Sequence, residues 1–201
     1  MQATDILSSE HRVIERVIAA LDAAAERLDA GASVRPGLFL DAVRFIREFA
    51  DGFHHGKEEG VLFEAMARGG MPLDDGPIGM MLYEHERGRE ITAGLEKAAK
   101  RLEAGEANAA AAVADHARAY GELLSQHIYK EDNILFPMAD QAVVPQEQDT
   151  VLEEFARIER ELEAKHPRQS YLDLARLLCA EAGLDPDAVA PRQVSLPCHA
   201  G

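Results

Sequence analysis

The stretch that decides how this chain folds is His-Ile-Tyr-Lys-Glu-Asp-Asn-Ile-Leu-Phe-Pro at residues 127–137, because His-His-Gly-Lys-Glu-Glu-Gly-Val-Leu-Phe at residues 54–63 repeats its pattern. When the two stretches are aligned on Lys-Glu, each has a His four residues before a Glu. A His and a Glu four apart lie on one face of a helix, about 6 Å from each other. Each stretch therefore has the geometry of two ligands for one metal centre.

The repetition extends to the start of the chain, where Leu-Ser-Ser-Glu-His-Arg at residues 7–12 corresponds to Met-Leu-Tyr-Glu-His-Glu at residues 81–86. The chain therefore has two similar halves, and each contributes first a single His and then a His-x-x-x-Glu pair. The candidate metal ligands of this pattern are His11, His54, Glu58, His85, His127 and Glu131.

The composition indicates a helical protein with a substantial core. Of the 201 residues, 47% are hydrophobic, and the richness in Ala, Leu and Glu favours helices. The formal charge of −15 argues against nucleic acid and anionic membranes as partners, because both need a basic face. No apolar run approaches the roughly 18 residues of a transmembrane helix, and the first residues lack a signal-peptide pattern, so we expect a cytoplasmic protein. Two cysteines, Cys179 and Cys198, are too few for a disulfide framework or a thiolate metal site.

Apolar residues at helical spacing predict four long helices. The first covers about residues 5–29, the second follows residues 35–37 and stops at 69–70, the third begins near 77, and the fourth begins near 107. Their short connections predict an all-α fold, an up-down-up-down antiparallel four-helix bundle with a C-terminal helical extension. In that bundle the starts of helices 1 and 3 lie level with the ends of helices 2 and 4, which brings all the candidate ligands to one level.

The pattern changes near residue 145. We expect the metal-binding bundle at residues 1–144, and a C-terminal helical extension with a loosely ordered tail at residues 145–201. An apolar stripe on the extension must be buried, either on the end of the bundle that carries the site or against a second subunit in a homodimer. In either place we expect it to control the access of small molecules to the metals. The stripe consists of Leu152, Phe155, Ile158 and Leu162.

The polar side chains on the apolar stripes need a cation. A single buried His is more often a hydrogen-bonded core residue than a ligand. Left unsatisfied, however, each buried polar group would cost roughly 1–3 kcal/mol, and together they would rival the whole stability of a domain, about 5–15 kcal/mol. Because His-x-x-x-Glu units stand on two different helices, we favour a metal over mutual pairing.

The donor set favours two metal ions. Four imidazoles and two carboxylates exceed what one tetrahedral zinc takes, whereas two metals roughly 3.5–4 Å apart and sharing the carboxylates fit the count. Imidazole with carboxylate suits iron best, and manganese or zinc stays possible. The Glu-x-x-His motif of ferritin-like bundles does not occur at these ligands, because Leu124, Leu82 and Ser8 stand three residues before His127, His85 and His11. Only Asp51-x-x-His54 imitates it.

With these motifs in this order, residues 4–140 resemble the haemerythrin-like family of His-His-Glu cation-binding domains. The resemblance implies a four-helix bundle with a non-haem di-iron centre, in a family whose members bind oxygen or handle iron, peroxide or nitric oxide. It further implies that His11 and His54 serve one iron and His85 and His127 the other. In this assignment the carboxylates that bridge the two irons are Glu58 and Glu131.

The chain departs from the oxygen-carrying members of that family. They have a second His one turn after the third-helix His, where this chain has Arg89, and an Asp five residues after the last His, where this chain has Glu131 at four. Fewer imidazoles favour a sensor, a store or a reactive centre over reversible oxygen carriage. His55 could be a further ligand, although it lies about 100° round the helix from His54. We expect Glu15 and Glu59 to flank the ligands or to accept hydrogen bonds from them.

Three functions remain open. The first is a non-catalytic di-iron protein that binds or senses oxygen or a related small molecule, or handles iron. The second is an enzyme whose di-iron centre acts on peroxide, nitric oxide or ferrous iron. The third is a structural zinc bundle that serves a protein partner. The sequence does not choose the metal or its redox cycle.

Overall fold

The computed structural model describes residues 2–164, 167–190 and 192, and these residues form helices and connecting turns without any strand. Cys198 and part of the expected C-terminal tail lie outside the described residues. The elements are α1 (Ala3–Asp29), α2 (Pro36–Phe45), η1 (Ile46–His55), η2 (Glu58–Leu62), α3 (Phe63–Arg68), α4 (Gly76–Glu103), α5 (Ala109–Lys130), η3 (Glu131–Leu135), α6 (Phe136–Ala142), α7 (Pro145–Glu163) and α8 (Arg168–Ala182).

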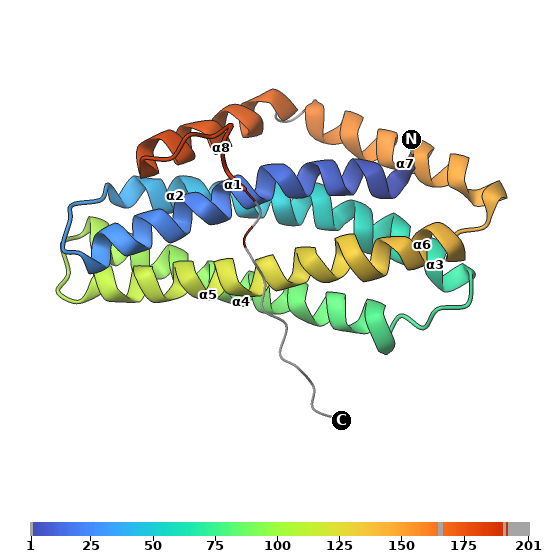
Figure 1. Cartoon of the computed structure of the whole chain (residues 1–201), viewed down its shortest axis with the longest axis horizontal. Coiled ribbons are helices and arrows are strands. Elements are labelled where there is room, and N and C mark those ends of the chain that lie inside the picture. Colours follow the sequence, from blue (N-terminus) through green and yellow to red (C-terminus); the bar gives the residue numbers. More distant parts are fainter. Residues whose placement is uncertain (1, 165–166, 191, 193–201) are drawn as a thin grey trace.

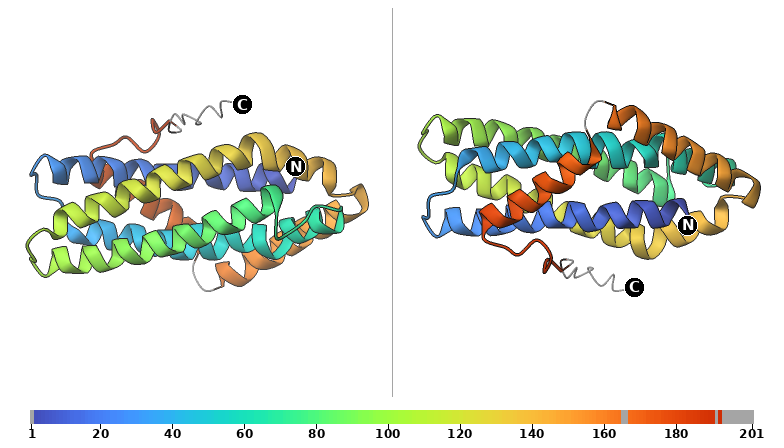
Figure 2. Two further views of the ribbon diagram at one scale, coloured as in Figure 1. Left: turned by 90° about the horizontal axis from the view of Figure 1, so that it is seen from below. Right: turned by 90° about the horizontal axis from the view of Figure 1, so that it is seen from above.

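The helices form one elongated bundle. Helices α1, α4, the run from α2 to α3 and the run from α5 to α6 lie side by side along its long axis (Figures 1 and 2). The turns from α1 to α2 and from α4 to α5 lie at one end, and the turns from α3 to α4 and from α6 to α7 lie at the other. Packing is most extensive between α1 and α5 and between α4 and α5. None of the helices in the described part of the chain is both long and apolar enough to cross a membrane.

Local sequence explains where the helices begin and end. The Asp75 carboxylate accepts a hydrogen bond from the Gly76 amide and caps α4, and Pro36 occupies the first turn of α2. Gly31 and Gly105 follow α1 and α4 with φ of 73° and 74°, a left-handed conformation that glycine adopts without strain. These signals put the expected helix starts and ends within about two residues of those observed.

Two apolar clusters lie on either side of a polar layer. One contains residues from the body of the bundle, such as Ile14, Phe49 and Leu124, together with residues of α8. The other contains Leu7 and Met81 and lies toward the end where α1 and α4 begin. Along the chain the candidate ligands fall between residues of the two clusters, except that His127 directly precedes Ile128 of the first cluster. Apolar side chains therefore flank the polar layer toward both ends of the bundle.

The C-terminal extension packs on both clusters. In α8, Tyr171 and Leu178 are buried in the first cluster, and in α7, Val151 and Phe155 are buried in the second. Phe155 is only 1% exposed. The expected packing of the α7 stripe on the site-bearing end of the bundle is thus confirmed for Phe155 and Ile158, whereas Leu162 packs against the first cluster. Its effect on access, and the division of the chain between residues 144 and 145, stay predictions.

The runs from α2 to α3 and from α5 to α6 are not purely α-helical, which the spacing of apolar residues did not predict. They contain the π-helical segments η1, η2 and η3, and each of these segments includes at least one candidate ligand. A π-helix pairs residue i with i+5, which widens the turn, and such segments are frequent at functional sites. η3 ends just before Pro137, which has no amide proton to continue an α-helical pattern.

Candidate metal centre

The bundle brings every ligand expected from the sequence into one buried layer. Helix α1 supplies one His, α4 supplies another, and the two π-containing helices each supply a His and a Glu. None of these side chains is more than 1% exposed: His11, His54, Glu58, His85, His127 and Glu131.

These side chains form two adjacent groups whose potential ligand atoms lie within 4.8 Å of one another. The first group consists of His11, His54, Glu58 and Glu131. The second consists of His55, Glu58, His85 and His127. Glu58 belongs to both groups, so the layer is one continuous double site.

Each carboxylate lies between a His of the first group and a His of the second. Glu58 places Oε1 3.4 Å from His54 Nε2 and Oε2 3.5 Å from His85 Nε2. Glu131 places Oε2 3.2 Å from Nε2 of both His11 and His127. Both carboxylates therefore reach from one half of the layer to the other.

A carboxylate holds the outer nitrogen of each of these imidazoles. His11 Nδ1 lies 2.9 Å from Asp132, and His85 Nδ1 lies 2.7 Å from Glu59. Asp132 and Glu59 directly follow the two central glutamates in sequence. The acidic residue next to each central Glu therefore orients a His on a neighbouring helix.

The other two imidazoles are held in the same way. His54 Nδ1 lies 3.0 Å from Glu10, and His127 Nδ1 lies 3.0 Å from Glu84. All four rings thus have Nδ1 engaged and present Nε2 to the centre of the layer. Metal-bound histidines nearly always have their second nitrogen held by a carboxylate, a carbonyl or a water, so this arrangement fits metal binding.

Two lysines complete the supports, and they differ in burial. Lys57 forms an ion pair with Glu10 and is 0% exposed, because α7 covers it: its Nζ lies 3.3 Å from Glu159 and 5.5 Å from the ring centre of Phe155. The equivalent Lys130 forms an ion pair with Glu84, but its side chain is 24% exposed. The two halves of the layer are therefore copies in sequence but not in surroundings.

His55 is buried as a member of the second group, although its angle from His54 on a regular α-helix pointed away from the layer. Its ring stacks on His85 with the ring centres 3.7 Å apart, and its Nδ1 lies 3.3 Å from Asp51. Arg89, at the place where oxygen-carrying haemerythrins have a His, binds Asp51 through Nε at 2.9 Å. Because η1 is a π-helix, consecutive side chains are closer in angle than α-helical geometry assumes.

Of the two other residues left open by the sequence, Glu59 supports the layer and Glu15 does not join it. Glu59 accepts from His85 and is also bound by Arg89 at 2.6 Å. Glu15 forms an ion pair with Arg12 at 3.0 Å and belongs to neither group.

The centre of the layer has buried polar atoms without hydrogen-bond partners. They are His11 Nε2 and both carboxylate oxygens of Glu58 and of Glu131, whose approaches to the imidazoles are ion-pair contacts without hydrogen-bond geometry. Buried polar atoms without partners are rare and costly, roughly 1–3 kcal/mol each. A cation bound between them would satisfy all of them, so the residues present fit a metal.

The ionisation of the metal-free layer is uneven. Burial, followed by the nearby charge of Glu131, raises the pKa of Glu58 well above its usual value. Burial alone would also raise the pKa of Glu131, but the imidazoles of His127 and His11 hold it well below its usual value. Burial alone would lower the pKa of His127, but the Glu131 and Glu84 carboxylates raise it to about 9. Without metal the layer thus retains protons, which a metal must displace.

Of the residues that support the ligands, Glu59 was expected from the sequence and the others were not. The repeat contained a sequence signal for Glu10 and Glu84, because in each copy one of them directly precedes a candidate His. Lys57 and Lys130, from the two Lys-Glu pairs, form ion pairs with these carboxylates. Their partners are far away in sequence, so local spacing could not reveal them.

Comparisons with known proteins agree with this geometry. A family model described as the Hemerythrin HHE cation binding domain matches residues 2–139. Uncharacterized proteins of Mycobacterium tuberculosis and Mycobacterium bovis are 25% identical over 135 residues, which is 67% of this chain and 52% of theirs. The chain thus spans about half the length of these curated relatives. No solved structure matches the chain.

Proposed function

The chain belongs to the hemerythrin family of HHE cation-binding domains, and from this premise we propose that its buried layer binds two iron ions and, through them, a small molecule such as oxygen. The observation that carries the proposal is the set of buried, unpartnered oxygens on Glu58 and Glu131, surrounded by imidazoles whose Nδ1 atoms are already engaged. Such a set is costly without cations and well suited to two of them.

In the proposed ligand assignment Glu58 and Glu131 would be shared by the two ions. His11 and His54 would hold one ion, and His85, His127 and His55 would hold the other. His55 would replace the imidazole that is missing because Arg89 stands where oxygen-carrying haemerythrins have a His. Arg89 itself binds Asp51 and Glu59 behind the ligands. The two halves would then offer two and three imidazoles, so they would leave different numbers of positions open for a small molecule.

The mixture of imidazole and carboxylate is the reason to propose iron, with manganese or zinc as the alternatives. When bound, a pair of iron ions supplies redox chemistry and open positions for a small molecule. The chain's residues supply the rest: the supporting carboxylates fix the imidazoles, and the apolar clusters flank the layer toward both ends of the bundle.

We also propose that the bundle has the up-down-up-down four-helix arrangement of the sequence-based prediction. The positions of the turns at alternating ends support it, as does the single level of the ligands from all four helices. The helices α7 and α8 then form an additional layer over α1 and the second bundle helix.

Elemental analysis of the full chain, purified from cells supplied with iron, tests the metal proposal. We expect about two iron atoms per chain, and absorbance spectra that change when the anaerobic protein meets air. His54→Ala should lower the iron content, whereas His116→Ala, in the part of α5 before the layer, should not. A reproducible single zinc, with no iron after reconstitution, would refute the di-iron assignment and favour a structural zinc bundle. Turnover of peroxide, nitric oxide or ferrous iron would make the protein an enzyme with the same site.

A further inference from the structure

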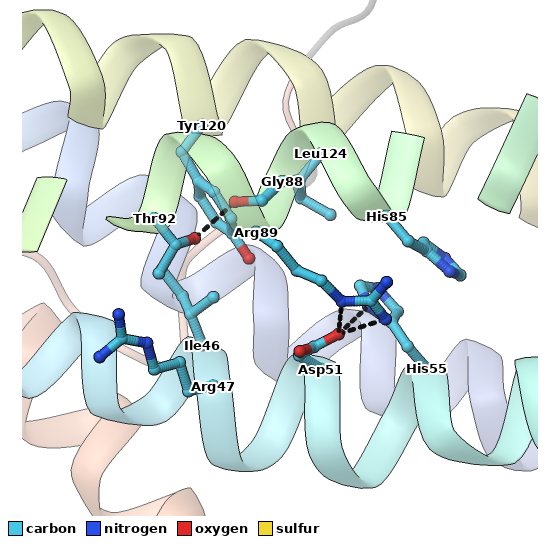
Figure 3. Close-up of a pocket in the computed structure, with 10 residues that line it drawn as sticks. All are labelled: Ile46, Arg47, Asp51, His55, His85, Gly88, Arg89, Thr92, Tyr120 and Leu124. Atoms are coloured by element: carbon cyan, nitrogen blue, oxygen red, sulfur yellow. Dashed lines mark hydrogen bonds and ion pairs between the residues drawn. The ribbon is translucent and has the colours of Figure 1, made fainter. Parts of the chain in front are cut away.

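A cavity of about 90 Å³ lies against the second ligand group, and two of its wall residues, His55 and His85, belong to that group. A water molecule takes about 30 Å³ in the liquid, so the cavity has room for about three groups of that size. Figure 3 shows the cavity between α4, α5 and the second bundle helix, with Arg89 reaching from α4 to Asp51. The cavity is therefore a small compartment next to one half of the metal layer.

Gly88 contributes the open space on the α4 side of this cavity. Glycine in a helix interior is destabilising relative to alanine. A Cβ atom at this position would meet only Leu124, at 3.6 Å, which is an ordinary contact. Close packing therefore does not require glycine here, and the effect of its missing side chain is to leave the cavity open.

The charged residues of the cavity wall are already paired. Arg47 binds Glu96 at 2.6 Å, and Arg89 binds Asp51 at 2.9 Å. No unpaired charge among these described wall residues is left to attract an ion. The cavity is thus better suited to an uncharged molecule than to an anion.

Tyr120 is the wall residue that has a hydrogen bond to offer. The Thr92 hydroxyl already donates to the Gly88 carbonyl at 2.7 Å, whereas the Tyr120 hydroxyl has no partner among the described residues. Tyr120 is 2% exposed, and in Figure 3 its ring enters from α5 with the hydroxyl directed between the helices. Burial, with the nearby Asp51 charge, raises the pKa of Tyr120, so its hydroxyl keeps its proton and remains a donor.

We propose that this cavity binds a small uncharged molecule with a hydrogen-bond acceptor, that Tyr120 donates to it, and that Gly88 keeps the space for it. The proposal rests on the proposed metal centre in one respect, because it places the bound molecule beside the second ligand group. It goes further by assigning the size and charge of the molecule and the residues that select it.

Xenon tests the cavity without any metal chemistry. Crystals of the full chain under xenon pressure should show xenon in the cavity of the wild-type protein. Tyr120→Phe should show it too, because the loss of the hydroxyl does not remove the space, and the metal content should make no difference. Gly88→Leu should abolish this xenon site. If Gly88→Leu does not fold, Gly88→Ala should reduce the occupancy. Equal occupancy in the glycine variants and the wild type would overturn the role of Gly88, and an empty wild-type cavity would overturn the site.

Nitric oxide, an uncharged diatomic with an acceptor, tests the hydrogen bond. Titration of the anaerobic ferrous protein, followed by absorbance, should show about fivefold weaker binding in Tyr120→Phe, the effect of one hydrogen bond of about average strength. Tyr83→Phe is the matched control, because Tyr83 is 62% exposed on α4. Equal affinities at equal iron content would overturn the role of Tyr120. A chain without iron would instead refute the metal proposal, while the xenon result would still decide the cavity.

Discussion

The stability of the metal-free protein should fall as the pH rises from about 6.5 to 9, because of His127. Its pKa is raised to about 9 in the folded protein, since the Glu131 and Glu84 carboxylates outweigh the opposing effect of burial. In the unfolded chain the pKa of a His is about 6.5. The group therefore contributes stability that is complete below pH 6.5 and is lost as the pH passes through the folded-state value.

The size of this effect follows from the shift. A difference of about 2.5 pKa units, at 1.36 kcal/mol each, gives about 3 kcal/mol between the two ends of the window. For a chain of about 200 residues, 1 kcal/mol changes the melting temperature by about 2–4 °C, so the expected decrease is about 6–12 °C. Glu58 acts in the same direction, because its pKa is also raised on folding.

Thermal unfolding at pH 6.5, 7.5 and 9 provides the assay, with protein stripped by a chelator and checked by elemental analysis. His127→Gln should show a much smaller decrease over this window, because glutamine does not titrate. The metal-loaded protein should behave differently, because its ligands have already lost their protons, so the gap between loaded and stripped melting temperatures should widen with pH. A flat profile for the stripped wild type, or an equal decrease in His127→Gln, would refute the reasoning.

Three substitutions test the rest of the site. His55→Ala should reduce the iron content from about two to about one per chain, and a content equal to that of His116→Ala would exclude His55 as a ligand. Phe155→Ala should lower the free energy of unfolding by about 3–5 kcal/mol, because it opens a cavity under α7, and should speed the loss of iron to a chelator. Leu177→Ala, which changes a side chain 56% exposed on α8, should do neither, and equal chelation rates would show that α7 does not shield the metals. Glu10→Gln should lower metal affinity about 10–100-fold in competition titrations, the usual effect of losing a carboxylate behind a ligand; an unchanged affinity would deny that role.

The sequence was sufficient to predict the helices and the buried residues of the layer. The 3.6-residue period puts His127 and Glu131 on one helix face, and the internal repeat supplies the matching pair at His54 and Glu58. The order of single His and His-x-x-x-Glu then fixes which helices must meet. These signals are local, so they can be recognised without knowledge of the tertiary structure.

Other features depend on contacts between helices. The burial of His55 was not expected, because a regular α-helix would turn it away from the layer, whereas the structure has η1 at this position. Glu10 and Glu84 act on histidines more than forty residues away, so no spacing within one helix reveals them. The cover over Lys57 requires α7, whose position on the bundle is set by the burial of Phe155. Each of these features is determined by tertiary packing rather than by periodicity.

The π-helical segments have a consequence for how such a chain can change its length. In the turn between α3 and α4, an added or removed residue alters only the path between two helices, and the ligands stay in place. Within residues 46–58 the same change would rotate the following side chains around the helix axis and turn Glu58 away from the layer. We therefore expect insertions and deletions to be tolerated in the turn between α3 and α4 but not within residues 46–58.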